Sequence, residues 1–82
     1  MSAVERSIMR FISRDILHSK SIATVSPDQQ LLAGGVLDSL GLQRLVMFLE
    51  TEFKITVGDD NLVPENFESI RAIARFVEVL RR

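Results

Sequence analysis

The chain has 82 residues and no cysteine, and ten Lys and Arg residues stand against eleven Asp and Glu residues, a formal charge of −1. A chain of this length buries a modest core, so we expect residues 1–82 to form a single domain with little room for a deep enzyme cleft. The composition excludes disulfides and thiolate metal sites, gives no basic surplus for nucleic acid, and contains no apolar run near the roughly 20 residues that cross a bilayer.

Residues 3–18 are predicted to form the first helix. Apolar residues recur there every three or four positions and share one face: Val4, Ile8, Phe11 or Ile12, and Ile16. Arg6, Arg10 and Arg14 lie four apart on another face, a row that is either simply solvated or docks an acidic partner. Glu5 and these arginines interrupt the apolar residues, which does not fit a signal peptide, so the expected location is the cytoplasm.

Residues 19–37 are predicted to form a long loop. Ser26-Pro27-Asp28 has the composition of a turn, and Gly34 and Gly35 give the backbone freedom before the next helix. Long loops in compact domains are usually functional or disordered. Four apolar residues can anchor this one to a core and favour an ordered loop: Leu31, Leu32, Val36 and Leu37.

A second helix is predicted over Ser39–Phe53, with Asp38 as its N-cap, because a carboxylate can accept the free amide hydrogens of the first turn. Its apolar stripe is complete: Leu42, Leu45, Val46, Leu49 and Phe53. Lys54 at the carboxyl end suits the helix dipole. Leu40 and Met47 lie off the stripe, which indicates a partner-facing patch, a wall beside a cargo or, equally for Met47, a place in the core.

The next segment is predicted to be a loop with a short helical turn near residues 59–63, broken around Pro64. Ile55 and Val57 are β-branched, but the stretch is too short and isolated to build a sheet. Ser69 then caps a last helix with its own apolar stripe: Ile70, Ile73, Ala74, Val77 and Leu80. These elements predict an all-α fold, a small four-helix bundle of three longer helices and one short helix.

The serine in GGVLDSLGLQRL stands where a loop becomes a helix, as a helix cap, a nucleophile or an attachment point. A nucleophile elbow needs Gly-x-Ser-x-Gly after a strand, but Leu37 replaces the first glycine and no strand is predicted. A Ser-x-x-Lys pair fails because position 42 is leucine, and nothing in the sequence places the single histidine, His18, near Ser39. These patterns argue against a small hydrolase, and we expect no enzyme activity and no catalytic residue.

The sequence also gives no complete metal site. Asp59-Asp60-Asn61 resembles the start of a calcium-binding loop, but the glutamate required at loop position 12 is absent, because position 70 is isoleucine. With one histidine and no cysteine, no other set of ligands is evident, so we expect no bound metal.

The run GGVLDSLGLQRLVMFLETEF resembles the modification site and second helix of the acyl carrier and peptidyl carrier family. The likeness covers nearly the whole chain, with further matches at Phe53-x-Ile55 and Phe67-x-Ser69-Ile70. The family's Asp-Ser-Leu motif falls on Asp38-Ser39-Leu40. The resemblance implies an acyl-carrier-type bundle with 4'-phosphopantetheine attached to Ser39. It also implies that Asp38 assists recognition by the phosphopantetheinyl transferase and its metal, and that Leu40 contacts a partner or the arm.

The resemblance implies a carrier that holds an aminoacyl or acyl group as a thioester and shuttles it between separate enzymes. Its partners would be a phosphopantetheinyl transferase, an aminoacyl- or acyl-activating ligase, and a downstream transferase or synthase. We expect a monomer that binds neither nucleic acid nor a membrane. An unmodified, carrier-like interaction module is the alternative outside carrier function.

The second helix departs from the pattern of fatty-acid carriers, which place acidic residues along it. Here Gly41 stands where those carriers typically have an aspartate, and Gln43 and Arg44 follow, which argues against docking to basic fatty-acid synthase surfaces. Gly41 either lets a partner or the arm approach closely or reflects drift. Asp-Ser-Leu-Gly-Leu-Gln together with DNLVPENFESI is similar to stand-alone carriers outside fatty-acid synthesis, some of which are loaded with an amino acid. We favour that aminoacyl subgroup over carriers of fatty-acyl or polyketide intermediates.

Overall fold

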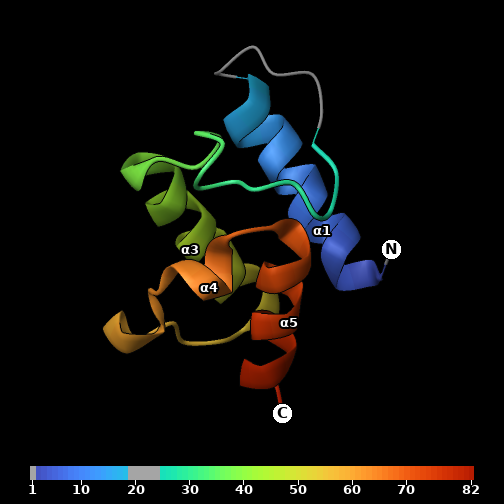
Figure 1. Cartoon of the computed structure of the whole chain (residues 1–82). Helices are drawn as coiled ribbons and strands as arrows, with labels where there is room; N and C mark the ends of the chain where they lie inside the picture. The colour runs from blue at the N-terminus through green and yellow to red at the C-terminus, as the bar shows by residue number, and fades with distance from the viewer. Residues whose placement is uncertain (1, 19–24) are drawn as a thin grey trace.

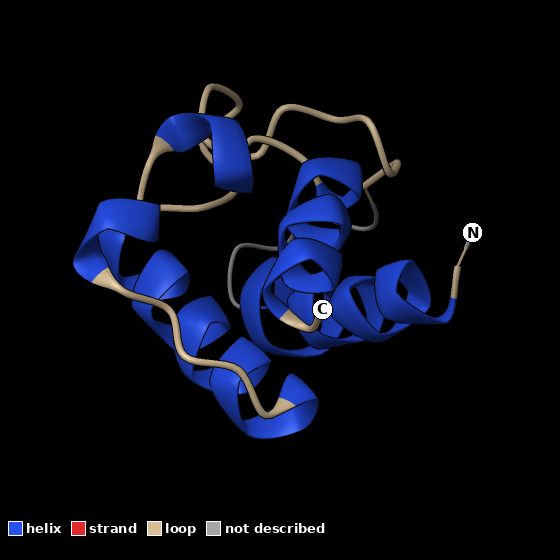
Figure 2. Cartoon of the chain, turned by 90° about the horizontal axis from the view of Figure 1, so that it is seen from below, coloured by secondary structure: helices blue, strands red, loops and turns tan. Residues whose placement is uncertain are grey.

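The computed structural model describes residues 2–18 and 25–82 (Figure 1). In these ranges every regular element is helical and no strand is present, which confirms the all-α prediction (Figure 2). The elements are α1 (Ala3–Phe11), the π-helix η1 (Ile12–Leu17), α3 (Ser39–Phe53), the 3-10 helix η2 (Asp59–Asn61), α4 (Pro64–Phe67) and α5 (Ile70–Leu80). No helix in the described ranges is long and apolar enough to cross a membrane.

The first predicted helix consists of α1 followed by η1. A capping box starts α1: the Glu5 amide donates to the Ser2 hydroxyl oxygen at 3.1 Å, and the Ser2 amide donates to the Glu5 carboxylate at 2.8 Å. That hydrogen bond from the Ser2 amide holds the pKa of the Glu5 carboxyl below its ordinary value of 4.5. In η1 the π-helical turn brings residues five apart onto one face, and Ile12 and Leu17 are both buried.

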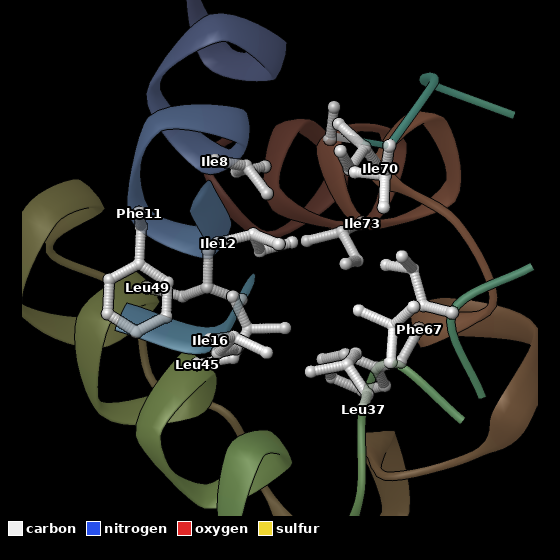
Figure 3. Packing of buried hydrophobic residues seen from close by; sticks show 14 of the residues in the cluster. Ile8, Phe11, Ile12, Ile16, Leu37, Leu45, Leu49, Phe67, Ile70 and Ile73 are labelled. Atoms are coloured by element: carbon white, nitrogen blue, oxygen red, sulfur yellow. The ribbon is translucent and has the colours of Figure 1, made fainter. Parts of the chain in front are cut away.

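The core lies between α1, α3 and α5 and is closed by α4 and the loop that precedes α3. Figure 3 shows Ile8 and Ile12 of the first helical run, Leu45 and Leu49 of α3, and Ile73 of α5 within one cluster. The fully buried side chains come from all of these parts: Ile8, Ile12, Leu17, Leu31, Val36, Leu45, Leu49, Phe67, Ile70, Ile73 and Val77. A shared core of this kind fixes the start of α3 relative to the rest of the chain.

The loop before α3 is ordered over residues 25–37, as its apolar anchors predicted; residues 19–24 lie outside the described ranges. The Leu31 amide donates to the Glu68 carbonyl oxygen at 2.7 Å, and the Arg71 amide donates to the Pro27 carbonyl oxygen at 3.0 Å. The Arg71 side chain also pairs with Asp28 at 2.8 Å. The loop is therefore attached to the start of α5 before it delivers the chain to α3.

The segment between α3 and α5 contains one more helix than the sequence indicated. Lys54 ends α3 in the left-handed conformation, with φ of 56°, and residues 54–58 form no strand, as predicted. The predicted turn corresponds to η2. Pro64 follows this turn and is the first residue of the additional helix, α4. Proline is favoured there because the first helical amide has no intrahelical partner. Ser69 caps α5 as predicted, accepting from the Ala72 amide at 3.1 Å.

Candidate functional site

Asp38 is the residue that caps α3. Its carboxylate accepts a hydrogen bond from the Gly41 amide at 2.7 Å, and its carbonyl oxygen accepts one from the Leu42 amide at 2.8 Å. The predicted N-cap is thus confirmed. Because Asp38 supplies the cap, capping does not explain the serine that follows it.

Ser39 is the first residue of α3 and is exposed to solvent. Its hydroxyl forms no hydrogen bond with any residue in the described ranges. Ser69 provides a useful contrast, since it also stands at a helix start but is 7% exposed and uses its hydroxyl oxygen as the cap of α5. The Ser39 hydroxyl is therefore accessible and uncommitted, at a point that the folded bundle holds in place.

Gly41 is buried under the capping carboxylate. A Cβ atom at this position would lie 3.2 Å from the Asp38 Oδ1 atom, 3.5 Å from the Leu37 side chain and 3.8 Å from the Ile16 side chain. The glycine thus leaves room for the close approach of the capping carboxylate to the first turn of α3. Of the two alternatives for Gly41, close access of a partner or an arm does not fit the structure, because this position is buried.

An apolar groove of about 450 Å³ begins at Ser39. Its lining is Ser39, Leu42, Gln43, Val46, Met47 and Leu62. We call it the apolar groove. Leu42 and Val46 are the half-buried outer members of the predicted α3 stripe, whereas Leu45 and Leu49 are fully buried. Leu62, which follows η2, was not anticipated, because the sequence around it has no helical periodicity that would place it.

Three large apolar side chains are exposed near Ser39. Leu40 is 59% exposed, Met47 is 68% exposed and Leu62 is 43% exposed. The core alternative for Met47 is wrong, and the structure leaves both Leu40 and Met47 on the surface. Exposed apolar side chains beside a groove are typical of sites that bind a ligand or a partner.

The described residues contain no group of three or more His, Cys, Asp or Glu side chains that could hold a metal ion. In the segment that resembles the start of a calcium loop, the Asn61 side chain accepts from the Gly58 amide at 2.9 Å and helps to shape η2. This segment therefore has a structural role in the turn before α4.

Comparison with known proteins identifies the family of this chain. The chain is 33% identical over 67 residues to aminoacyl carrier protein 2 of Bradyrhizobium diazoefficiens, a match that spans 80% of this chain and 74% of the relative. The chain belongs to the aminoacyl carrier protein family. Aminoacyl carrier protein 1 of the same organism is 28% identical over 74 residues, 90% of this chain and 81% of the relative. No family model matches the chain.

A solved structure supports the same family membership. The aminoacyl carrier protein described here matches a chain in the crystal structure of Bradyrhizobium japonicum glycine:[carrier protein] ligase complexed with its cognate carrier protein and an analogue of glycyl adenylate. The match has a TM-score of 0.77 and 29% identity, and it covers 95% of this chain and 99% of that chain. The family assignment confirms the sequence-based expectation of a carrier protein rather than an enzyme.

Proposed function

We propose that this aminoacyl carrier protein bears 4'-phosphopantetheine on the Ser39 hydroxyl and carries an amino acid as a thioester between separate enzymes. The supporting observation is an exposed, uncommitted serine hydroxyl at the first residue of α3, directly beside the apolar groove. A phosphopantetheinyl transferase would modify Ser39, an amino-acid-activating ligase would load the arm, and a downstream transferase would accept the cargo.

The start of α3 suits a phosphodiester. The Ser39 and Leu40 amides belong to the first turn and have no intrahelical partner, while the Gly41 amide already donates to Asp38. The positive end of the dipole of this 15-residue helix also favours an anionic group. A phosphate on the Ser39 Oγ atom would therefore lie where backbone amides and the helix dipole stabilise its charge.

The apolar groove suits the remainder of the arm. When bound, the group supplies a terminal thiol on which an acyl group is held as a thioester. Leu42 and Val46 form part of the groove's lining on α3, and Leu62 contributes from the segment before α4. These side chains would shelter the hydrocarbon part of the arm while Ser39 fixes its root.

The cargo that we propose is an amino acid, loaded by a ligase that first activates the amino acid as an adenylate. The support comes from the two aminoacyl carrier relatives and from the matched structure, in which a carrier is bound to glycine:[carrier protein] ligase with an analogue of glycyl adenylate. The weakly charged α3, in which Gln43 and Arg44 follow the modification site, also differs from the acidic helix expected of a fatty-acid carrier.

Loading can be tested on the phosphopantetheinylated protein. With ATP, an amino-acid:[carrier protein] ligase and a mixture of amino acids, we expect the intact mass to rise by one aminoacyl group and to return to its starting value with hydroxylamine, which cleaves thioesters. Fatty-acyl loading by an acyl ligase is the matched comparison. Efficient fatty-acyl loading without aminoacyl loading would contradict the proposed cargo class.

Asp38 can be tested for two separate contributions, the helix cap and its charge. Asp38→Ala removes the carboxylate that accepts from the Gly41 amide, and we expect a loss of about 1 kcal/mol in the free energy of unfolding. Asp38→Asn retains a good capping side chain, so we expect stability within about 0.5 kcal/mol of the natural chain. Thermal unfolding of both variants measures this difference.

The same pair of variants tests whether the charge of Asp38 helps modification. If Asp38 assists the transferase and its metal, the Asp38→Asn variant should be modified at least about tenfold more slowly than the natural chain, although its fold is intact. A tenfold change in rate corresponds to about 1.4 kcal/mol in the barrier. Initial rates of mass conversion at limiting transferase give the comparison. Equal rates for Asp38→Asn and the natural chain would restrict Asp38 to the capping role.

A further inference from the structure

A second groove lies between the first helical run and α3, and it shares Met47 with the apolar groove. Its volume is about 500 Å³. We name it the arginine groove after Arg14 and Arg44. Its lining also includes Phe11, Asp15, Met47 and Phe48. Because Met47 borders both grooves, the surface is continuous from Ser39 to the arginine groove.

Part of the lining of the arginine groove is aromatic and held in place. The Phe11 ring of α1 stacks on the Phe48 ring of α3, with centroids 4.4 Å apart and planes within 13°. Phe48 also meets the edge of the Phe53 ring, with centroids 6.1 Å apart. Such contacts restrict the rings, so an apolar side chain of a partner would meet a preformed aromatic surface.

The arginine groove carries a net positive charge although the chain as a whole has a charge of −1. Arg44 forms no ion pair with any residue in the described part of the chain. Arg14 has Asp15 at 3.9 Å, but their side chains are 71% and 46% exposed, and a solvent-exposed pair of this kind contributes little. Both guanidinium groups are thus available to carboxylates from outside, and they come from different elements, η1 and α3.

We propose that the arginine groove docks an acidic surface of the ligase that loads the arm. An apolar side chain of the ligase would contact the Phe11–Phe48 stack, and ligase carboxylates would pair with Arg14 and Arg44. The positive charge of the groove and its continuity with the candidate site support this docking, which rests on the proposed function. In this proposal Arg14, the last arginine of the row on the first helix, and Arg44 of α3 belong to one docking surface.

The position of the arginine groove fits an enzyme that must receive the arm. Arg44 lies five residues after Ser39, about 7.5 Å along the helix axis. Ser39 itself does not line the arginine groove, so side chains that fill this groove need not cover the root of the arm. The transferase, in contrast, must contact the Ser39 hydroxyl directly.

The test measures the steady-state kinetics of aminoacylation with the phosphopantetheinylated natural chain, Arg14→Glu, Arg44→Glu and the double variant. Glycine:[carrier protein] ligase of Bradyrhizobium is the probe, and Arg75→Glu, an exposed arginine on α5, is the matched control. We expect each groove variant to raise the KM for the carrier about tenfold with kcat changed less than twofold, and the control to leave both constants unchanged. Arg44→Lys keeps the positive charge, so its KM should stay close to that of the natural chain.

Ionic strength provides a second readout. Raising the salt concentration should increase the KM of the natural chain severalfold and reduce its advantage over the charge-reversed variants, because salt screens exposed charges. A KM that is the same for the natural chain and both groove variants would overturn the proposal. A rise as large in Arg75→Glu, or a rise in the KM of the transferase instead, would also overturn it.

The proposed function has its own readout in the same experiment. The intact mass before aminoacylation shows whether the transferase has modified the chain, and this result does not depend on the ligase. A chain that gains the arm but is loaded equally well with and without the groove arginines retains the proposed function and loses the arginine-groove proposal.

Discussion

Ser39→Ala is expected to abolish phosphopantetheinylation and therefore all loading with cargo. The substitution removes the hydroxyl oxygen that would bond to the phosphate, and no rearrangement of the bundle replaces it. Ser39 is exposed and Asp38 supplies the cap, so we expect the free energy of unfolding to change by no more than about 0.5 kcal/mol. Intact mass after incubation with coenzyme A and a transferase measures modification, and thermal unfolding measures stability.

Ser13→Ala is the matched control for this experiment. Ser13 is also an exposed serine, but it lies within η1 and not at the first residue of α3. We expect Ser13→Ala to be modified at the rate of the natural chain. A Ser39→Ala variant that still gains the mass of the arm would show that another residue is the attachment point.

Phe67→Ala is expected to have the largest effect on stability of the substitutions considered. Phe67 is 1% exposed at the end of α4, and its ring meets the Phe76 ring edge-on with centroids 5.4 Å apart. Replacing a buried phenylalanine with alanine costs about 3–5 kcal/mol, which is a large part of the total stability of a small domain. We expect the melting temperature to fall by about 12 °C or more.

Met47→Ala is the control for Phe67→Ala, because Met47 is a large apolar residue that is 68% exposed. Thermal or urea unfolding should show a change of less than about 1 kcal/mol for Met47→Ala. Similar losses in the two variants would contradict the placement of Phe67 in the core and of Met47 on the surface. Leu62 of the apolar groove lies just before α4. Loss of the Phe67 side chain that anchors α4 should therefore disturb the groove and also slow loading.

Much of the fold could be predicted from the sequence because helical periodicity and caps are local signals. Asp38 and Ser69 cap the helices that they were expected to cap, and the apolar residues of the loop before α3 are buried or half-buried. The family motif also directed attention to Ser39, and the structure leaves its hydroxyl exposed and without a hydrogen bond to any described residue.

The remaining features depend on contacts between distant parts of the chain. The burial of Gly41 depends on Leu37 and Ile16 packing against it. Leu62 joins the apolar groove only because the segment before α4 folds back toward α3. Periodicity within one helix carries no information about such contacts.

The arginine groove illustrates the same limit. In the sequence, Arg14 is part of an arginine row on the first helix, and Arg44 is one of the residues that differ from the fatty-acid carrier pattern. No spacing in the sequence indicates that these two side chains line the same groove. The Phe11–Phe48 stack brings α1 and α3 together, and the two arginines then line one groove.

The most direct measurement is the intact mass of the purified chain before and after incubation with coenzyme A and a broad-specificity phosphopantetheinyl transferase, with peptide mapping of any added mass. We expect one phosphopantetheine increment, located on Ser39. No increment in a folded sample, alongside a control carrier that is modified, would contradict carrier function through Ser39 and would favour an unmodified interaction module.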